Sequence, residues 1–272
     1  MPSYRKHSVS STKTYEICPR QWWFKYHQRV KVDVQVPWHW RLGTVIHRGL
    51  EAAFKARAEH RTVAAASVPS MKAYEAAAFD AIARAWVKEG MGEPAGGDWH
   101  DVHRQVGDTL RHVAVPKRED VLGVEYKFDA TLPDGTPVIG FADLVLKAGD
   151  TILIRDWKSS SSPMKPEDLA EDFQLGTYGA LAAEVWQVRK IYASHFHTPV
   201  QIENMVEITR DVQLDAVARI EAVAEMIEMD DRYEPRVGQQ CGECVFQSIC
   251  PAWTPEARAA RDNEAMTAIE AF

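Results

Sequence analysis

Residues 151–162, TILIRDWKSSSS, and the preceding stretch 140–146, GFADLVL, decide the fold that this sequence predicts. The apolar run 152–154 predicts a buried strand that ends in charged residues and a serine-rich turn. Because side chains alternate between the two faces of a strand, Asp156 and Lys158 leave the sheet on the same face. The sequence therefore places a carboxylate and an ammonium group together at the end of a strand.

A second carboxylate, Asp143, lies in a strand expected at 138–147. The turn at 147–151 is short enough to pair this strand, as a hairpin, with the strand that carries Asp156. Two carboxylates then converge beside Lys158, which is the minimal inventory for a divalent-metal phosphodiesterase site. The structural alternative is an ordinary salt bridge between Asp143 and Lys158 at the rim of the sheet.

The segment before this hairpin adds a third strand. Residues 121–130, VLGVEYKFDA, alternate as a strand does, and the turn PDGTP at 133–137 leads into the next strand. Three consecutive antiparallel strands form a meander. Glu125 therefore belongs to the strand that pairs with the Asp143 strand, and it could add a third carboxylate to the site.

Length and composition limit the classes of protein to which this chain can belong. The chain has 272 residues, is 46% hydrophobic and carries a formal net charge of -7. It can bury a sizeable core, as one elaborated domain or a domain with a large insertion. No apolar run of about 18 residues and no apolar signal core occur, which predicts a soluble, cytoplasmic protein outside the membrane. Because the net charge is negative, any attraction to DNA must come from a local basic groove and from bound metal.

Two common nucleotide motifs are absent from the sequence. Neither G-x-x-x-x-G-K-[ST] nor G-x-G-x-x-G occurs, so the sequence indicates no nucleotide motor and no dinucleotide-binding fold.

Four cysteines are distributed unevenly. Three of them form a C-x2-C-x5-C cluster at 241–250, and Cys18 lies more than 200 residues earlier. Since nothing suggests secretion, this pattern favours a four-thiolate metal site over two disulfides or four unrelated buried thiols. The local spacing leaves a structural zinc and an iron–sulfur cluster both open.

The N-terminal segment 8–27 combines aromatic and basic residues at helical spacings. We expect a helix capped by one of residues 10–12, with a break or restart at Pro19. Its basic and aromatic face, which includes Arg20, could stack on bases, but core packing is the more frequent use of such aromatics.

A second helix is expected at 42–60, beginning at the Gly-Thr pair 43–44 and carrying His47 in its first turns. A lone histidine at such a position is usually structural. His47 becomes a metal ligand only if the fold brings it opposite Asp143 and Asp156.

The remaining elements are mostly helical. Residues 69–90 and 98–113 predict two helices of an insertion, which we interpret as a possible lid over a substrate channel. Residues 166–186 predict one helix, whose Gln174 and Tyr178 are four apart and so share a face, toward a phosphate or base or toward solvent. Further strands are expected at 188–198 and 201–208, a helix at 212–229, and a polar helical end after Trp253.

Seven pieces of the sequence, taken in order, resemble the PD-(D/E)XK nuclease superfamily. Within it they are similar to the RecB-like exonucleases that carry a four-cysteine iron–sulfur cluster, including the CRISPR-associated exonucleases of the fourth Cas family and the nuclease domain of AddB. The pieces are CPRQWWFKY from Cys18, GTVIH ending at His47, Glu125, GFAD ending at Asp143, DWK at 156–158, QLGTY at 174–178 and C-x2-C-x5-CP at 241–251. Only residues 52–120 and the last twenty lie outside the pattern.

The resemblance implies an α/β, restriction-endonuclease-like core, in which a mixed sheet is flanked by helices. A single nuclease domain would span 1–272, with a helical insertion at 52–115 and a cysteine loop at 235–253. A [4Fe-4S] cluster would staple the N-terminal helix to this loop, because it closes a loop across the whole domain. Its ligands would be Cys18, Cys241, Cys244 and Cys250.

The resemblance also implies a role for each site residue. The ligands of Mg2+ or Mn2+ would be His47, Asp143, Asp156 and the carbonyl of Trp157, with Glu125 supporting the site or a second metal. Lys158 would orient or activate the attacking water and stabilise charge on the phosphate. Gln174 and Tyr178 would position the DNA strand near the metal.

The implied function is a metal-dependent DNA exonuclease that acts on single-stranded DNA or DNA ends, in recombination, repair, phage DNA processing or CRISPR spacer acquisition. A helicase or recombination partner is plausible, because the chain has no motor motif of its own. Two other classes stay open. One is a catalytically silent nucleic-acid-binding or adaptor protein, and the other is a zinc-stapled structural protein whose carboxylates are rim salt bridges.

Overall fold

The computed structural model describes residues 6–32, 36–59, 71–113 and 116–254, which divide into two compact units. The larger, which we call the sheet unit, comprises Val36–Leu132 and Pro137–Ala218. The smaller, which we call the cysteine unit, comprises Met1–Gln35, Pro133–Thr136 and Arg219–Phe272. The cysteine unit is thus built from both ends of the chain and one turn. The expectation of a single nuclease domain over 1–272 stays a prediction.

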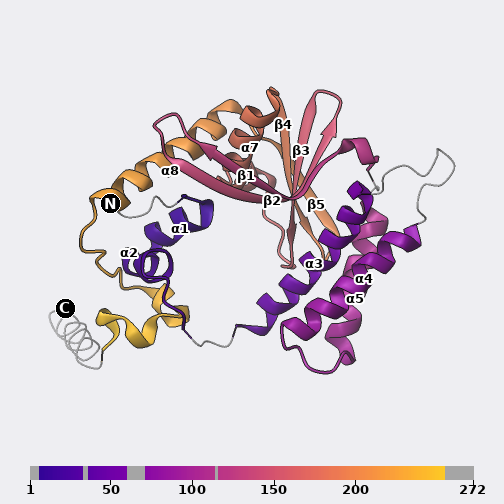
Figure 1. Cartoon of the computed structure of the whole chain (residues 1–272), viewed down its shortest axis with the longest axis horizontal. Coiled ribbons are helices and arrows are strands. Elements are labelled where there is room, and N and C mark those ends of the chain that lie inside the picture. Colours follow the sequence, from indigo (N-terminus) through magenta and orange to yellow (C-terminus); the bar gives the residue numbers. More distant parts are fainter. Residues whose placement is uncertain (1–5, 33–35, 60–70, 114–115, 255–272) are drawn as a thin grey trace, which may run out of the picture. The chain divides into compact units, whose positions relative to one another are not determined.

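A five-stranded mixed sheet forms the centre of the sheet unit (Figure 1). In spatial order its strands are β1 (Val121–Thr131), β2 (Pro137–Ala148), β3 (Thr151–Lys158), β4 (Lys190–His197) and β5 (Ile202–Glu207), with the short 3-10 helix η2 (Arg118–Asp120) before β1. The pairs β1–β2, β2–β3 and β4–β5 are antiparallel, and β3–β4 is parallel. The predicted α/β fold class, a mixed sheet flanked by helices, is therefore confirmed.

The hairpin of β2 and β3 forms where the sequence predicted it. Gly149 in its turn has a φ of 62°, a left-handed backbone that glycine adopts without Cβ strain. The apolar side chains of Ile152 and Ile154 are fully buried, as expected for a central strand. With β1 paired to β2, the predicted three-stranded meander is confirmed.

Helix α3 (Trp38–Glu59) packs against one face of the sheet, and α4 (Met71–Lys88) and α5 (Gly96–His112) pack against α3. Their apolar faces form one buried cluster with Leu144, Trp157 and Phe196 of the sheet. The segments expected to be helical within 52–115 are therefore helical in the described part. Their role as a lid stays a prediction.

The start of α3 differs from the prediction. The helix begins at Trp38 rather than at the pair 43–44, and the indole of Trp38 donates a 2.9 Å hydrogen bond to Asp98 of α5, which fixes this first turn. Gly43 lies inside the helix, and a Cβ built at this position would lie 2.8 Å from Ser159 Oγ. The glycine thus serves the close approach of α3 to the end of β3, not a helix start.

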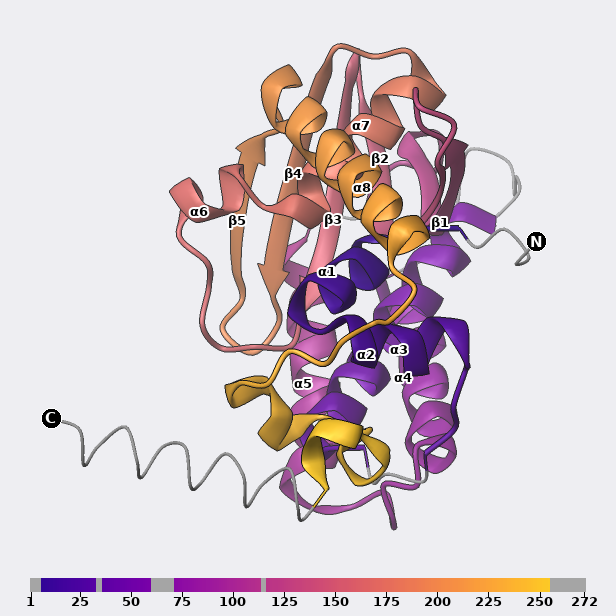
Figure 2. The same cartoon turned by 90° about the vertical axis from the view of Figure 1, so that its left-hand side faces the viewer.

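The opposite face of the sheet is covered by the crossover between β3 and β4, which a parallel pair requires. It contains α6 (Pro166–Ala170), which packs on β5, and α7 (Phe173–Trp186), which packs on β3 and β4 (Figure 2). The single helix predicted at 166–186 is therefore wrong. The chain breaks because the carboxylate of Asp172 caps α7 by accepting a 2.9 Å hydrogen bond from the backbone of Leu175.

The cysteine unit is a small helical assembly. Its elements are α1 (Val9–Ile17), α2 (Pro19–Trp22), the π-helix η1 (Trp23–His27), the C-terminal part of α8 (Arg210–Met229) and the 3-10 helices η3 (Gln239–Glu243), η4 (Gln247–Ile249) and η5 (Pro251–Trp253). Tyr15, Trp22, Val223 and Ile227 form its core, and Trp22 stacks on Tyr233 at 5.6 Å between ring centroids. The aromatic residues Tyr15 and Trp22 of segment 8–27 are thus used in packing.

The cap of α1 also differs from the prediction. Ser8, not one of residues 10–12, begins the helix: its hydroxyl accepts a 3.1 Å hydrogen bond from the backbone of Ser11, and the Ser11 hydroxyl accepts one of 3.0 Å from the backbone of Ser8. This reciprocal pair satisfies two orphan donors at once. The predicted break at Pro19 is confirmed, since Cys18 is extended and α2 starts at Pro19.

Two other expectations concern the ends of the chain and the membrane. The polar helical end predicted after Trp253 lies outside the described residues from position 255 onward. Across the described ranges, no helix combines the length and the apolar character that crossing a bilayer requires.

Candidate active site

The hairpin of β2 and β3 brings Asp143 and Asp156 together. Leu144 pairs with Arg155 across these two antiparallel strands. Asp143 and Asp156, which come next to this pair, are therefore also opposite each other, and their side chains share one face. Asp143 Oδ2 accepts a 2.7 Å hydrogen bond from the backbone N–H of Trp157. This contact fixes one oxygen of Asp143 to β3 and leaves the other for a further partner.

That partner is His47 of α3. Its Nδ1 lies 3.4 Å from Asp143 Oδ1, and Glu125 of β1 completes a set in which one ligand atom from each residue lies within 4.8 Å of the others. Among the described residues, this is the only group of three or more such side chains that meets that spacing. The sequence predicted all three as site residues, and the fold gathers them from a helix and two strands.

Glu125 has an unusual backbone conformation within β1. The pairing of β1 with β2 shifts between Val121 and Gly123, and Glu125 has a φ of 50°. A positive φ at a residue other than glycine costs of order 1–3 kcal/mol and clusters at functional sites. Glu125 therefore departs from regular strand geometry, although its neighbours Val124 and Tyr126 pair in register with Leu144 and Ala142.

Asp156 lies beside this set rather than within it. Its carboxylate is buried, Oδ2 is 2.6 Å from Lys158 Nζ, and Oδ1 accepts a 2.7 Å hydrogen bond from the side-chain amide of Gln174. Both oxygens of Asp156 thus have partners from the protein. Asp156 and the carbonyl of Trp157 as metal ligands, and Lys158 as a catalytic residue, stay predictions.

The electrostatics of the site favour a cation. Burial raises the pKa of Asp156 to about 6, an effect that the charge of Lys158 opposes. Burial and the charge of Asp143 raise the pKa of Glu125. Burial alone would lower the pKa of His47, but its hydrogen bond with Asp143 and the charge of that carboxylate outweigh burial and raise it. A divalent cation bound among carboxylates with raised pKa values would stabilise their ionised forms.

The donor atoms also fit such an ion. Carboxylate oxygens suit Mg2+ and Mn2+, and an imidazole nitrogen is compatible with Mn2+ and other transition metals. The set of His47, Glu125 and Asp143 therefore has the right chemistry for a divalent metal, in agreement with the predicted cofactor.

Two histidines that the sequence interpretation missed lie on the same face. His195 and His197 of β4 pair in parallel register with Asp156 and Lys158. Both are buried, and His195 Nε2 lies 3.9 Å from Asp156 Oδ2, while His197 Nδ1 lies 3.2 Å from the hydroxyl of Ser160. The alternating pattern His-x-His within a strand was the available signal, since residues two apart face the same side.

Gln174 and Tyr178, predicted to contact DNA, both lie close to the carboxylates. Tyr178 is only 7% exposed and packs on Phe128 at 6.0 Å between ring centroids. Burial, and next the charge of Asp156, raise the pKa of its hydroxyl. The interpretation of Gln174 and Tyr178 as a solvent-facing pair is therefore wrong. Their contact with DNA stays a prediction.

Arg20, also predicted to contact DNA, belongs to the cysteine unit. Its guanidinium donates a 2.9 Å hydrogen bond to the backbone carbonyl of Arg232 and lies 5.2 Å from the ring of Trp23. These contacts use Arg20 within its own unit, so its role in binding DNA stays a prediction.

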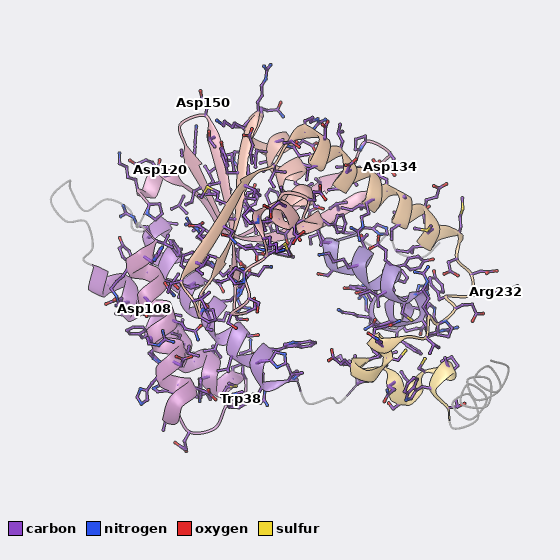
Figure 3. The ribbon with its side chains drawn as sticks, turned by 180° about the vertical axis from the view of Figure 1, so that it is seen from behind. Trp38, Asp108, Asp120, Asp134, Asp150 and Arg232 are labelled. Atoms are coloured by element: carbon purple, nitrogen blue, oxygen red, sulfur yellow. The ribbon has the colours of Figure 1, made fainter. Side chains whose placement is uncertain are left out.

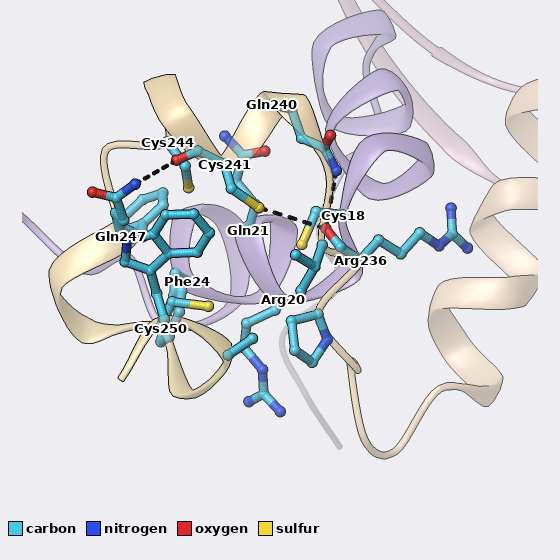
Figure 4. Close-up of a pocket in the computed structure, with 15 residues that line it drawn as sticks. Cys18, Arg20, Gln21, Phe24, Arg236, Gln240, Cys241, Cys244, Gln247 and Cys250 are labelled. Atoms are coloured by element: carbon cyan, nitrogen blue, oxygen red, sulfur yellow. Dashed lines mark hydrogen bonds between the residues drawn. The ribbon is translucent and has the colours of Figure 1, made fainter. Parts of the chain in front are cut away.

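The four cysteines of the cysteine unit line one cavity (Figure 4). Cys18 enters from the link between α1 and α2, and Cys241, Cys244 and Cys250 from the 3-10 turns near the C-terminus. All four are free thiols, and burial, together with the other three cysteines, raises the pKa of Cys244. The predicted convergence of Cys18 with the C-terminal cluster is therefore present.

The spacing of these thiols bears on what they hold. Zinc binds thiolates at about 2.3 Å in a tetrahedron, which brings the sulfurs within about 3.8 Å of one another. No three of these four cysteines, all of them described, have sulfurs within 4.8 Å of one another. Four thiolates that face one cavity suit either a zinc ion or an iron–sulfur cluster.

Comparison with known proteins gives three results. The family model described as the PD-(D/E)XK nuclease superfamily matches residues 6–251. The Gene 69 protein of Mycobacterium phage L5 is 25% identical over 139 residues, a match that covers 48% of this chain and 44% of that protein. The crystal structure of SSO0001 aligns with a TM-score of 0.34 and 15% identity over 75% of this chain and 95% of that one.

Proposed function

This chain belongs to the PD-(D/E)XK nuclease superfamily, and from that membership we propose that it is a metal-dependent exonuclease that hydrolyses the phosphodiester bonds of single-stranded DNA or of DNA ends. One observation carries the proposal. His47, Glu125 and Asp143 gather their ligand atoms within 4.8 Å, next to the ion pair of Asp156 and Lys158. Carboxylates that can hold a metal, with a lysine beside them, suit metal-dependent hydrolysis of a phosphodiester.

The metal in this proposal is Mg2+ or Mn2+. Its ligands would be His47 and Asp143, with Asp156 and the carbonyl of Trp157 completing the set and Glu125 supporting it. When bound, the ion would neutralise charge on the phosphate and lower the pKa of the attacking water.

The chain's own residues then supply position and charge. Lys158 is 30% exposed at its side chain, so its ammonium can reach a phosphate while it stays paired with buried Asp156. It would orient the water and stabilise the charge that develops on the phosphate. Gln174 holds the other oxygen of Asp156, which keeps this carboxylate from rotating away from the site.

The cysteine cavity supports the second half of the proposal, a [4Fe-4S] cluster on Cys18, Cys241, Cys244 and Cys250. The cluster would tie the N-terminal helices to the C-terminal turns, with a structural role. Support comes from the convergence of all four thiols on one cavity.

The test is degradation of end-labelled single-stranded and double-stranded DNA with Mg2+, Mn2+ or EDTA. Wild type is compared with Asp156→Asn and with Asp150→Asn, a control at an exposed carboxylate in the turn of the same hairpin. We expect metal-dependent loss of label with wild type and the control, and none with Asp156→Asn. A folded wild type that cleaves neither substrate with either metal would refute the proposal.

The biological setting follows only from the resemblance. Recombination, repair, phage DNA processing and CRISPR spacer acquisition all fit an exonuclease of this class. A helicase or recombination partner and a cytoplasmic location stay predictions.

A further inference from the structure

One face of helix α3 carries both Trp40 and His47, and the proposed chemistry uses only His47. Its apolar side, with Val45, Leu50 and Phe54, is buried in the core of the sheet unit. Trp40 and His47 are seven residues apart and so share one face of the helix, which borders the buried side and passes to Phe54 one further seven-residue step along. Trp40 is 58% exposed. An indole with that much exposed surface is unusual, because tryptophan is highly buried on average.

The first turn of α3 is held in place, so Trp40 is presented on a fixed backbone. Trp38 donates its indole hydrogen bond to Asp98 and packs edge-on against Trp86 at 6.2 Å. Arg41 covers Trp38 at 5.1 Å. In Figure 3, Trp38 marks this start of α3, at the end of the helical layer far from the turn that contains Asp150. Trp40 is therefore an open aromatic surface on an anchored helix, not the end of a fraying one.

The distance from Trp40 to the candidate metal site suits a short piece of nucleic acid. Seven residues of helix rise about 10.5 Å at 1.5 Å per residue. Stacked nucleotides advance about 3.4 Å along a strand. A strand whose phosphate lies beside His47 would thus place a base near Trp40 about three nucleotides away.

A basic groove runs along the same helix. Residues of α3 and α4 line an open groove of about 430 Å³ that begins at Thr44, one turn from Trp40. Its charged lining residues are the cations Arg48, Lys55, Arg84 and Lys88 and the anions Glu51 and Glu89. Arg48 and Lys55 both pair with Glu51, and Arg84 pairs with Asp80 next to the groove, so the lining keeps a small surplus of positive charge in a chain whose formal charge is -7. Such a local surplus attracts a polyanion against the global balance.

We propose that Trp40 and the α3–α4 groove form a binding track for single-stranded nucleic acid, in which a base stacks on the indole and backbone phosphates follow the cations. The track rests on the proposed nuclease function and names the part of the substrate that it holds. A duplex does not fit, because its base faces are stacked inside the helix and are closed to Trp40. Aromatic platforms beside basic grooves are the general means of holding unpaired strands.

The test measures binding of a fluorescein-labelled oligothymidylate by fluorescence anisotropy in EDTA, which prevents cleavage. We expect Trp40→Ala to raise Kd by about 5- to 150-fold, the range that loss of one base–aromatic stack gives. Trp40→Phe should keep most of the affinity. On an abasic strand of equal length, wild type and Trp40→Ala should bind alike, because the phosphates remain and the stacking base does not.

The cations are tested through salt. Arg84→Ala/Lys88→Ala should reduce the slope of log K against log salt by about 1.4, which is about 0.7 for each phosphate that the protein no longer neutralises on a single strand. The matched control, Arg189→Ala/Lys190→Ala, removes two exposed cations at the start of β4, at the opposite end of that strand from His195 and His197. This control should leave the slope unchanged.

Wild type is assayed in parallel for cleavage of the same strand with Mn2+, which separates the two proposals. If wild type cleaves the strand while Trp40→Ala binds it as tightly as wild type does, the track is refuted and the nuclease stands. The exposed indole would then belong to a protein interface. If folded wild type neither binds nor cleaves the strand, both proposals fall.

Discussion

Asp143 and Asp156 are held by the strands of a sheet, whereas Cys18 and Cys241 are held by a link between helices and by 3-10 turns. In the sheet unit, backbone and side-chain hydrogen bonds of 2.7 Å fix the carboxylates before any metal arrives. In the cysteine unit, four thiols face one cavity, yet no three of these described sulfurs approach within 4.8 Å. The carboxylate site is preorganised by the fold, whereas we propose that the cysteine site is completed by its ligand.

This difference has a physical origin. Strands repeat every two residues and are fixed by a ladder of hydrogen bonds, so a carboxylate at a strand end inherits a rigid frame. Short 3-10 turns have no such frame, and Cys18 is more than 200 residues from Cys241. In our proposal, a cluster that binds all four thiols overcomes the loop entropy that separates them. We therefore expect changes in the first region to affect catalysis and changes in the second to affect stability.

The largest expected effect is on catalysis. Lys158→Ala should reduce the rate of cleavage on the order of 10²- to 10³-fold, as the loss of one preorganised group that stabilises transition-state charge does. Lys158→Arg should restore little, because a planar guanidinium does not reproduce a compact ammonium. The rate is measured on end-labelled single-stranded DNA with Mn2+.

The control for this variant is Lys147→Ala, at an exposed position near the other end of the hairpin. Visible absorption from the cysteine unit should be the same in both variants. Equal rates for Lys158→Ala and Lys147→Ala would show that the two regions do not divide catalysis and stability as we propose.

The next effect is on stability. Cys241→Ala should abolish visible absorption of the purified protein and lower its free energy of unfolding by about 3 to 5 kcal/mol, the scale on which closing a loop of more than 100 residues stabilises a fold. Ser248→Ala, an exposed position in the same segment, is the matched control. Iron content and urea unfolding are the measurements. A colourless wild type, or a Cys241→Ala protein as stable as the control, would contradict the staple.

The smallest expected effect is a gain in stability. Asp156→Asn should raise the free energy of unfolding without metal by about 1 to 3 kcal/mol at pH 7, since a pKa raised from 3.8 to about 6 means that the buried charge destabilises the folded state. The folded state binds the proton more tightly than the unfolded state does. The cost of the charge is therefore absent below about pH 4, grows between about pH 4 and pH 6, and is complete above that range.

Thermal unfolding in EDTA at pH 5 and pH 7 measures this difference, with Asp150→Asn as the exposed control. The increase in stability that Asp156→Asn gives relative to wild type should be larger at pH 7 than at pH 5. A gain that shrinks as the pH rises would mean that Asp156 is not held in a desolvated site, and the contrast between the two regions would weaken.

The elements of the sheet could be predicted because their signals are local. Alternation gave β1, an apolar run gave β3, and a five-residue turn gave the β2–β3 hairpin, each at close to its observed bounds. The errors arose where a distant contact outweighed the local signal. Trp38 begins α3 early because Asp98 of another helix binds it, and Gly43, which resembles a helix start, lies within the helix at its close approach to Ser159.

Part of the candidate site could also be predicted from the sequence. The sequence predicted the strand-end residues Asp143, Asp156 and Lys158, but His195 was missed. His195 and Asp156 are 39 positions apart in the sequence, and only the parallel pairing of β4 with β3 makes them neighbours. The exposed Trp40 was likewise invisible, because the sequence does not tell which aromatic residues the core leaves uncovered.

By itself the sequence determined the meander and the place of Asp143, Asp156 and Lys158 along it, because strand alternation and short turns act between neighbours in the chain. Only the tertiary structure decided that His47 and Glu125 join Asp143, that Asp156 stands beside this set with Lys158 and Gln174, and that four thiols face one cavity. Each of these contacts joins different elements. Their approach depends on packing, which no local period in the sequence encodes.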